Sequence, residues 1–355
     1  MEATEIACPT GQSDILLASA DESVALLPWV EICNVGPLMI SDLRDSLRWV
    51  TGEYLKSPTL PLFRRVVETR DRTVELLRGR QTPKQSVELH SIAGWSMTVL
   101  AWMTTDLGRP DIARRHLRPA WAFADNADDN DLRAWIRAAE NTAAAWQGDY
   151  DQAAEAAASG LEYRASGSVE LLLASARAID LAHLGRTDES ASALHEALDI
   201  AARQADEASS DPLAGPFSCS LERAGGYWAD AAMVNGDAAR SIDFTSEAIE
   251  RFRRAVPAER NLGSERMVRC QQIKGHVVLG DLDVAVAELT KVVAMTPLEH
   301  RVEPLRQRVE EIVRLAQQTY GNSPQVVEIS HMAREFQHFA DLGNLPALAA
   351  DTNGE

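Results

Sequence analysis

Hydrophobic positions along this chain recur at intervals of three and four residues, the spacing of one face of an α-helix. Short polar turns separate the stretches that carry this pattern, and most turns contain a glycine followed by Asp or Arg. The clearest turn glycines are Gly108, Gly148, Gly185, Gly236 and Gly280. They lie 40, 37, 51 and 44 residues apart. Self-similarity at this period predicts stacked helical hairpins.

Small residues recur at fixed distances after each turn glycine. Five residues after it stand Ala113, Ala153, Ser190, Ser241 and Ala285. Twelve residues after it stand Ala120, Gly160, Ala197, Ala248 and Val292. We expect these residues to let the second helix of each hairpin press against the first helix and against the next hairpin. Glycine suits the turn because it adopts a positive φ at little cost.

The pattern divides the chain into an irregular segment, one continuous domain and a flexible tail: 1–37, 38–342 and 343–355. Within the domain it predicts a leading helix pair, five hairpins and a closing pair: 38–80, 82–296 and 300–342. Thr82 to Gln85 forms a capping-box sequence at the start of the first hairpin. A loop at 206–216, rich in Ser, Pro and Gly, accounts for the longest spacing between turn glycines.

The hairpin signature resembles the tetratricopeptide repeat, and its clearest copy is WQGDYDQAAEAAASGL, Trp146–Leu161. This resemblance implies an all-α fold, a right-handed superhelix of tetratricopeptide-like helical hairpins. Leu100–Asp129 and Asp131–Ala154 also resemble the C-terminal sensor half of helix-turn-helix (XRE-type) regulators from high-GC Gram-positive bacteria. That family carries an N-terminal DNA-binding module. The first 37 residues here contain no Lys or Arg, so we expect the module to be lacking.

Composition limits the partners. The formal net charge of −18 and the pI near 4.9 disfavour direct binding of nucleic acid, whose phosphates would be repelled. The four cysteines are isolated, which is typical neither of a zinc site nor of a disulfide framework. No secretory signal or membrane-spanning stretch is evident. We therefore expect a cytoplasmic protein without a metal, cofactor or membrane partner, and a homodimer is possible.

The first helix of each hairpin supplies candidate ligand-binding residues, because this helix lines the concave wall of such a superhelix. Trp95 and Trp102, seven residues apart on one predicted helix, suit an aromatic or apolar ligand. The polar candidates are Arg137, Asn141, Arg177, Asp180, Arg223 and Asp230. The arginines would hold an anionic group, such as a peptide carboxylate, through bidentate hydrogen bonds. The alternative interpretations are inter-helix packing for the tryptophans and a plain solvent face for the polar residues.

Three functions fit this sequence. The first is a binding or regulatory protein that recognises a peptide, a small metabolite or a partner protein in its concave groove. The second is a transcriptional regulator that acts through a separate DNA-binding partner. The third is an enzyme recruited from a regulator-like scaffold in a biosynthetic pathway, which requires a closed pocket with a titratable group of shifted pKa. The sequence contains no recognisable catalytic motif.

Overall fold

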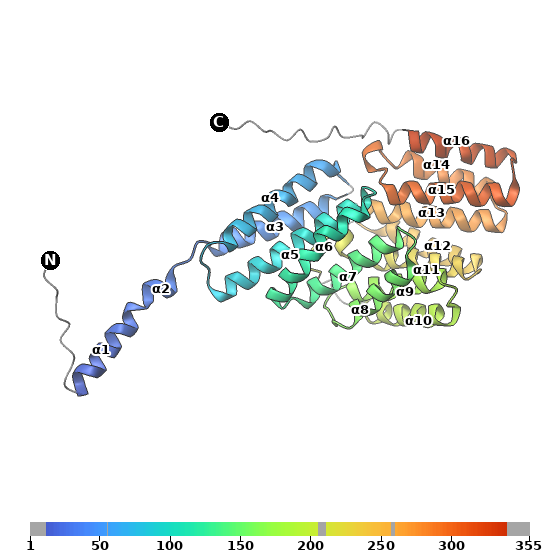
Figure 1. Cartoon of the computed structure of the whole chain (residues 1–355). Coiled ribbons are helices and arrows are strands. Elements are labelled where there is room, and N and C mark those ends of the chain that lie inside the picture. The colour runs from blue at the N-terminus through green and yellow to red at the C-terminus, as the bar shows by residue number, and fades with distance from the viewer. Residues whose placement is uncertain (1–11, 55, 205–210, 257–259, 339–355) are drawn as a thin grey trace, which may run out of the picture.

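The structure is a computed structural model that describes residues 12–54, 56–204, 211–256 and 260–338. These residues form α-helices that follow one another as hairpins (Figure 1), joined by short turns and two single-turn 3₁₀ helices. The described part of the chain contains no β-strand, apart from one isolated bridge between Tyr54 and Ser57. The all-α prediction is therefore confirmed.

The leading pair consists of α3 (Pro37–Glu53) and α4 (Thr59–Leu77). The five hairpins are α5 (Pro83–Asp106) with α6 (Pro110–Ala127), α7 (Asn130–Ala145) with α8 (Tyr150–Leu161), α9 (Val169–His183) with α10 (Thr187–Gln204), α11 (Leu221–Val234) with α12 (Ala238–Arg254), and α13 (Leu262–Leu279) with α14 (Leu282–Ala294). The closing pair is α15 (Glu303–Tyr320) and α16 (Pro324–His338).

The turns and contacts predicted for the hairpins are present. All five turn glycines have positive φ, between 70° and 90°. Every small residue five or twelve positions after them is buried. Thr82 and Gln85 form the predicted capping box at the start of α5. Each hairpin is therefore closed by a left-handed glycine and packed through small side chains.

The structure differs from the sequence prediction in the segment 1–37. Two helices, α1 (Gln12–Ala25) and α2 (Leu27–Glu31), occupy most of its described part. Pro28 does not prevent helix formation, because it stands in the first turn of α2, where a missing N–H breaks no intrahelical bond. The predicted tail 343–355 lies outside the described residues. The division of the chain into domains stays a prediction.

The buried apolar side chains form two main cores. One runs without interruption from α3 to α11 and contains most of the buried tryptophan and leucine side chains. The second joins α13, α14, α15 and α16. A small cluster of Ala248, Ile249, Phe252 and Val268 lies between α12 and α13. The molecule thus consists of two packed blocks that are joined through the fourth and fifth hairpins. Helices of both blocks line the cavity on the concave side.

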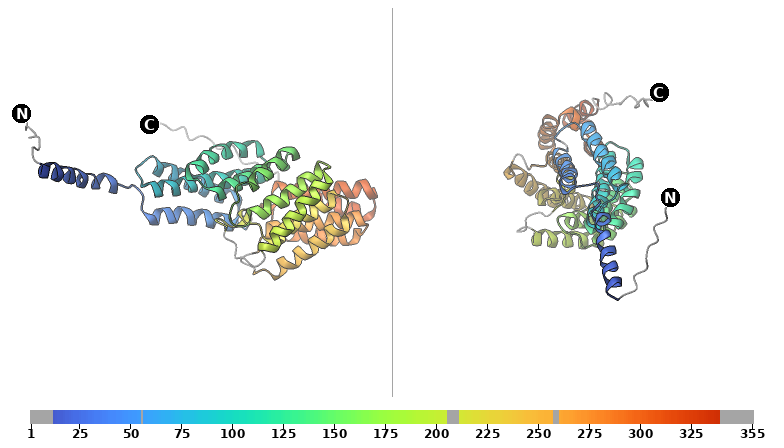
Figure 2. Two further views of the ribbon diagram at one scale, coloured as in Figure 1. Left: turned by 90° about the horizontal axis from the view of Figure 1, so that it is seen from below. Right: turned by 90° about the vertical axis from the view of Figure 1, so that its left-hand side faces the viewer.

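The superhelix curves far enough to bring α15, the first helix of the closing pair, opposite the first two hairpins (Figures 1 and 2). Glu303, at the start of α15, lies against Gly108 in the α5–α6 turn; a Cβ at Gly108 would stand 3.3 Å from its Cγ. The guanidinium of Arg308, one turn further along α15, lies over the Trp146 ring at the end of α7, 5.6 Å from its centroid. The concave side is therefore enclosed by elements from both blocks.

Enlarging a small residue between packed helices should destabilise the fold. Ala153 in α8 and Ala120 in α6 have no exposed surface. We expect Ala153→Leu and Ala120→Leu each to lower the free energy of unfolding by roughly 1–3 kcal/mol through overpacking, measured by urea denaturation. Glu310→Gln, at an exposed position, is the control. Losses no larger than that of the control would contradict the helix contacts described.

Candidate functional site

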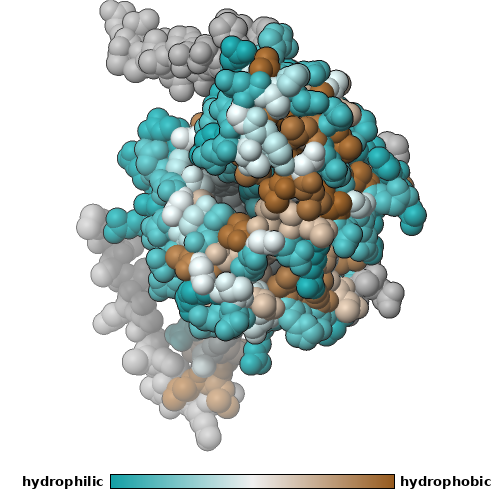
Figure 3. All heavy atoms as spheres, turned by 90° about the vertical axis from the view of Figure 1, so that its right-hand side faces the viewer, coloured by the Kyte–Doolittle hydropathy of each residue, from teal (hydrophilic) through white to brown (hydrophobic). Residues whose placement is uncertain are grey.

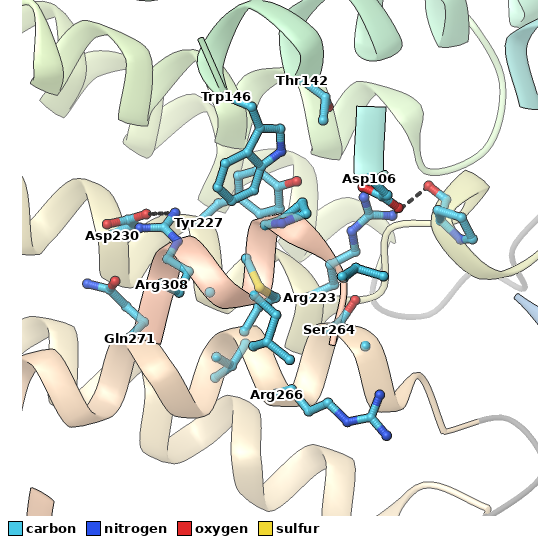
Figure 4. A pocket seen from close by; sticks show the side chains of 18 of the residues that line it. Asp106, Thr142, Trp146, Arg223, Tyr227, Asp230, Ser264, Arg266, Gln271 and Arg308 are labelled. Carbon is cyan, nitrogen blue, oxygen red and sulfur yellow. Dashed lines mark hydrogen bonds and ion pairs between the residues drawn. The ribbon is translucent and has the colours of Figure 1, made fainter. Parts of the chain in front are cut away.

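A cavity of about 1270 Å³ opens on the concave side of the superhelix. Its walls are the inner faces of α7, α9, α11, α13 and α15, together with the C-terminal ends of α3 and α5. Figure 4 shows side chains from these helices converging on it from opposite sides. A concave pocket with apolar walls and a few convergent polar groups is the usual form of a ligand site.

One end of the cavity is crossed by a network of four charged side chains. Asp230 of α11, only 2% exposed, pairs with Arg308 of α15 and accepts from Lys274 Nζ of α13 at 3.5 Å. Glu311 of α15 accepts from Lys274 at 3.1 Å and from Arg308 at 3.1 Å. Burial alone would raise the pKa of Asp230, but Arg308 and Lys274 outweigh it and lower the pKa well below its usual range. These pairs join α11, α13 and α15 across the cavity wall.

Aromatic and apolar side chains stand next to this network. Trp146 faces Arg308, and Tyr150 at the start of α8 stacks on His183 of α9 with ring centroids 4.1 Å apart. The apolar lining residues nearby include Ile179, Met233, Met267, Leu305 and Leu315. The cavity therefore combines apolar walls with buried charge, which suits a ligand that carries both apolar and polar groups.

The other end of the cavity contains a second buried polar group. Tyr54 donates to Asp106 Oδ2 at 2.7 Å, and both residues are less than 9% exposed. Arg223, also 8% exposed, donates to the carbonyl oxygens of Pro216 and Ser218 at 2.7 and 2.8 Å. Burial raises the pKa of Asp106 to about 7, although the hydrogen bond from Tyr54 and the charge of Arg223 oppose the change.

Two further polar groups line the wall between these ends. Asn141 donates to Asp180 Oδ2 at 2.6 Å and to the Ala153 carbonyl oxygen at 2.9 Å, so it joins α7, α8 and α9. Burial raises the pKa of Asp180 to about 8, against the opposing effect of the Asn141 hydrogen bond. Gln271 of α13 is 3% exposed, and its carboxamide has no hydrogen-bond partner among the described residues. It leaves a donor and an acceptor unused on the cavity wall.

The loop between α10 and α11 runs through the interior of the superhelix. We call residues 211–218 the strap. Arg48 Nε of α3 donates to the Pro212 carbonyl oxygen at 3.1 Å, and the Ala214 N–H donates to Thr51 Oγ1 at 3.2 Å. Gly215 has a φ of 61°, and a Cβ there would stand 2.1 Å from the Thr51 carbonyl oxygen. The strap thereby ties the fourth hairpin to the leading pair.

Phe217 of the strap fills the aromatic part of the groove. Its ring centroid lies 5.4 Å from those of Trp102 and Trp135 and 6.1 Å from that of Trp95. Phe217 is 1% exposed and Trp95 is 5% exposed. The chain's own phenylalanine therefore occupies the space beside Trp95 and Trp102 that the sequence suggests for an aromatic ligand.

The structure brings together some of the sequence-predicted site residues and separates others. Those that line the cavity are Trp102, Asn141, Asp180, Arg223 and Asp230. Those that lie outside it are Trp95, Arg137 and Arg177. The role of the first group in ligand binding stays a prediction. The position of the second group outside the cavity gives no support to such a role.

The two arginines outside the cavity face the second helices of the hairpins. Arg137 lies over the Trp121 ring of α6 at 4.7 Å and pairs with Glu140 at 2.8 Å. Arg177 points toward Glu196 of α10, 3.8 Å away. Successive residues of a helix are rotated by about 100°, so a small error in register moves a side chain to another face. This rotation separates Arg177 from the cavity-lining Ile179 of the same helix. Arg137 lies one turn before the cavity-lining Asn141, but its guanidinium is held by Trp121 and Glu140.

Sequence reasoning missed the functional candidates on the last helices. Lys274 and Gln271 on α13, and Arg308 and Glu311 on α15, line the cavity but lie outside the predicted set. The apolar residues of α15 at 305, 309, 312 and 316 form its packing face. The reasoning applied to the first helices of the hairpins, which assigns polar residues outside the packing face to the groove, would have drawn attention to Arg308. Nothing in the sequence indicates that this arginine meets Asp230, 78 residues earlier.

No family model matches this sequence, and a search of curated proteins gave no match. Solved structures do resemble it. NprR in complex with its cognate peptide NprX shows 11% identity and a TM-score of 0.50, over 94% of this chain and 90% of that one. BtubC from P. vanneervenii shows 16% identity and a TM-score of 0.45, over 74% of this chain and 94% of that one.

The chain has a tetratricopeptide-like fold. The predicted superhelix of tetratricopeptide-like hairpins is thereby confirmed, and these similarities concern the fold alone. Among the described residues, no cluster of three or more His, Cys, Asp or Glu side chains is placed to hold a metal ion. No described helix has both the length and the apolar character needed to cross a bilayer.

The buried carboxyl of Asp180 should make stability depend on pH. Its pKa is raised from 3.8 to about 8, so the folded state keeps a proton that the unfolded chain loses near pH 4. Stability therefore falls as pH rises between these values. We expect Asp180→Asn, which still accepts from Asn141, to gain about 3–4 kcal/mol relative to wild type between pH 5 and pH 8.

The measurement is chemical denaturation of both proteins across this pH range. Asp243→Asn, at an exposed position of α12, is the matched control. A difference between Asp180→Asn and wild type that is independent of pH would contradict a protonated Asp180 in the folded state.

Proposed function

We propose that this chain is a binding protein that holds a peptide, or a peptide-like small molecule, in the cavity between α7 and α15. The observation that carries this proposal is the large amphipathic cavity that opens on the concave side of the superhelix. Its volume accommodates a short peptide, and its wall offers apolar contacts beside the unused carboxamide of Gln271. NprR, which shares the fold, is described in complex with a peptide.

The charge of the cavity favours an anionic group on the ligand. Seven Lys and Arg side chains and six Asp and Glu side chains line it, although the whole chain has a net charge of −18. Two of the acidic side chains, Asp106 and Asp180, have pKa values raised to about 7 and about 8 by burial. Near neutral pH the lining is therefore net positive, a local exception in an acidic protein.

Regulation follows from the position of the cavity between the two packed blocks. A ligand seated there contacts α7 on one side and α15 on the other. Binding would favour one distance between these helices and so shift the curvature of the superhelix. A partner protein that recognises one curvature would then bind according to whether the ligand is present.

The test places a bulky side chain in the cavity without disturbing the core. Thr142 of α7 projects into the cavity (Figure 4) and is half-buried. We expect Thr142→Trp to retain less than about a tenth of the peptide that wild type retains from a random heptapeptide pool, quantified by mass spectrometry. The physical reason is that the indole occupies the volume that the peptide needs.

Thr319→Trp is the matched control. Thr319 lies on α15 outside the cavity, and its hydroxyl donates to the carbonyl four residues earlier, as that of Thr142 does. The control should retain peptide as wild type does. Equal retention by all three proteins, or none by wild type, would contradict peptide binding in this cavity.

A second candidate function is catalysis in the same cavity, favoured by the Asp106 group. A buried carboxyl with a pKa of about 7, hydrogen-bonded to Tyr54 and close to Arg223, is suited to general acid–base chemistry near neutral pH. The enzyme hypothesis requires such a titratable group in an enclosed pocket.

Asp106→Asn tests this second function. If the cavity is catalytic, wild type converts the small molecules that co-purify with it, and Asp106→Asn binds them unchanged, with turnover reduced at least about a hundredfold. Mass spectrometry of the bound species before and after incubation provides the measurement. Unchanged ligand on wild type after prolonged incubation would argue against catalysis and leave the binding function intact.

A further inference from the structure

A second, smaller cavity of about 490 Å³ lies between α4 and α6. One wall carries Arg70, Val74 and Arg78 of α4, and the other carries Arg115, His116 and Pro119 of α6. It shares no lining residue with the cavity between α7 and α15. We call this second cavity the α4–α6 groove.

The part of the chain that forms the groove is basic, although the whole chain is acidic. Residues 64–118 contain eleven Lys and Arg and six Asp and Glu. Residues 119–259 contain eleven Lys and Arg and twenty-five Asp and Glu, and residues 260–338 contain ten of each kind. The surface at the far end of the superhelix, around α13–α16, accordingly mixes hydrophilic and apolar residues (Figure 3). The excess of positive charge is therefore confined to the segment that contains α4 and α6.

Two arginines of the groove have no acidic partner. The side chains of Arg78 and Arg115 form no ion pair or hydrogen bond with any residue that the structure describes. The two acidic residues of the lining, Asp71 and Glu75, each pair with an arginine of their own helix, at 2.7 and 2.6 Å. The groove therefore presents positive charge that its own carboxylates do not neutralise.

His116 lies where the positive charges of both walls act together. Its ring is half-buried and forms no hydrogen bond with a described residue. Burial lowers the pKa of His116, and the charges of Arg70 on one wall and Arg115 on the other lower it further. Near neutral pH the imidazole is therefore neutral, and one ring nitrogen offers an N–H to a ligand. A position that disfavours a proton on imidazole favours an anion.

A phosphoryl group suits this arrangement. Guanidinium groups bind phosphate oxygens through paired, charge-assisted hydrogen bonds, and the imidazole adds a further donor. Val74, Met97 and Pro119 provide apolar contact for a small organic group beside the phosphoryl group. The volume of the groove lies within the range of small-molecule sites.

The distribution of charge favours a small ligand over a nucleic acid or a membrane. An extended polyanion on the groove would also meet the acidic surface of residues 119–259, which repels it. A small anion responds mainly to charges within about 8 Å, the screening length at physiological ionic strength. We propose that the α4–α6 groove binds a small molecule that carries a phosphoryl group, through Arg78, Arg115 and His116.

Isothermal titration calorimetry of the full chain with phenyl phosphate tests this proposal, because the probe joins a phosphoryl group to an apolar ring. Wild type should bind it with a dissociation constant of about 1 mM or lower, and should not bind benzyl alcohol, which lacks the anionic group. Arg78→Gln and Arg115→Gln should each weaken binding at least about fivefold, since each removes a charge-assisted hydrogen bond.

Arg64→Gln on α4 and Arg118→Gln on α6 are the matched controls. Both arginines are exposed, lie outside the groove and form no ion pair with a described residue. These controls should bind phenyl phosphate as wild type does, and all four variants should melt near the wild-type temperature, because exposed arginines contribute little to stability. No binding by wild type, or equal weakening in all four variants, would overturn the site.

The cavity between α7 and α15 is tested separately. Thr142→Trp, which obstructs that cavity, should bind phenyl phosphate as wild type does. Loss of binding in Thr142→Trp, with binding kept in Arg78→Gln and Arg115→Gln, would place the phosphoryl group in that cavity and overturn the groove. None of the expected outcomes in the groove depends on whether a peptide binds between α7 and α15.

His116 provides a local readout. Its ring-proton resonance is identified by its absence in His116→Gln and is titrated with sodium sulfate, or with sodium chloride at equal ionic strength. Sulfate resembles a phosphoryl group, and its charge stays constant near neutral pH. The charged groups that line the groove with His116 are Arg70, Asp71, Glu75, Arg78 and Arg115. A bound dianion should raise the pKa of His116. An equal pKa in the two salts would overturn anion binding beside His116.

Discussion

The close approach of the helices within each hairpin determines the rest of this structure. Left-handed glycines at the turns and buried small residues after them let each second helix lie against the first, so that successive hairpins stack on one another. The curved stack brings α15 opposite α7, and the cavity is the space between them. Ala153 contributes to both features, because it packs between helices and its carbonyl oxygen accepts from the cavity-lining Asn141.

Buried charged side chains determine the electrostatics of the cavity. Asp230, Arg308, Lys274 and Glu311 come from three helices, and their mutual pairing offsets the cost of burying each of them. Asp106 and Asp180 stay protonated to higher pH because burial penalises their charged forms. The cavity lining therefore does not share the strongly acidic character of the whole chain, whose net charge is −18.

Two apolar regions of the chain differ in how far other residues cover them. In the groove, Phe217 of the strap covers the tryptophans of α5 and α7, so the space available to a ligand shifts toward α9, α11, α13 and α15. At the N-terminal end, the large apolar side chains of α1 and α2 are left mostly exposed. The strap can cover these tryptophans because the loop to which it belongs begins in a neighbouring hairpin. These two helices project away from the other described helices (Figure 1).

The sequence by itself determined the helices, their turns and the repeat. These follow from local spacing: apolar residues every three or four positions, a glycine where φ is positive, and the capping box at Thr82 and Gln85. It also selected Asn141, Asp180, Arg223 and Asp230 among the cavity-lining residues, because these lie on the first helices of the hairpins. Only the tertiary structure decided that Arg137 and Arg177 face the second helices, that Phe217 occupies the aromatic groove, and that Arg308 meets Asp230. The physical reason is that local spacing fixes a helix, whereas its rotation about its own axis and its distant neighbours depend on how all the hairpins pack together.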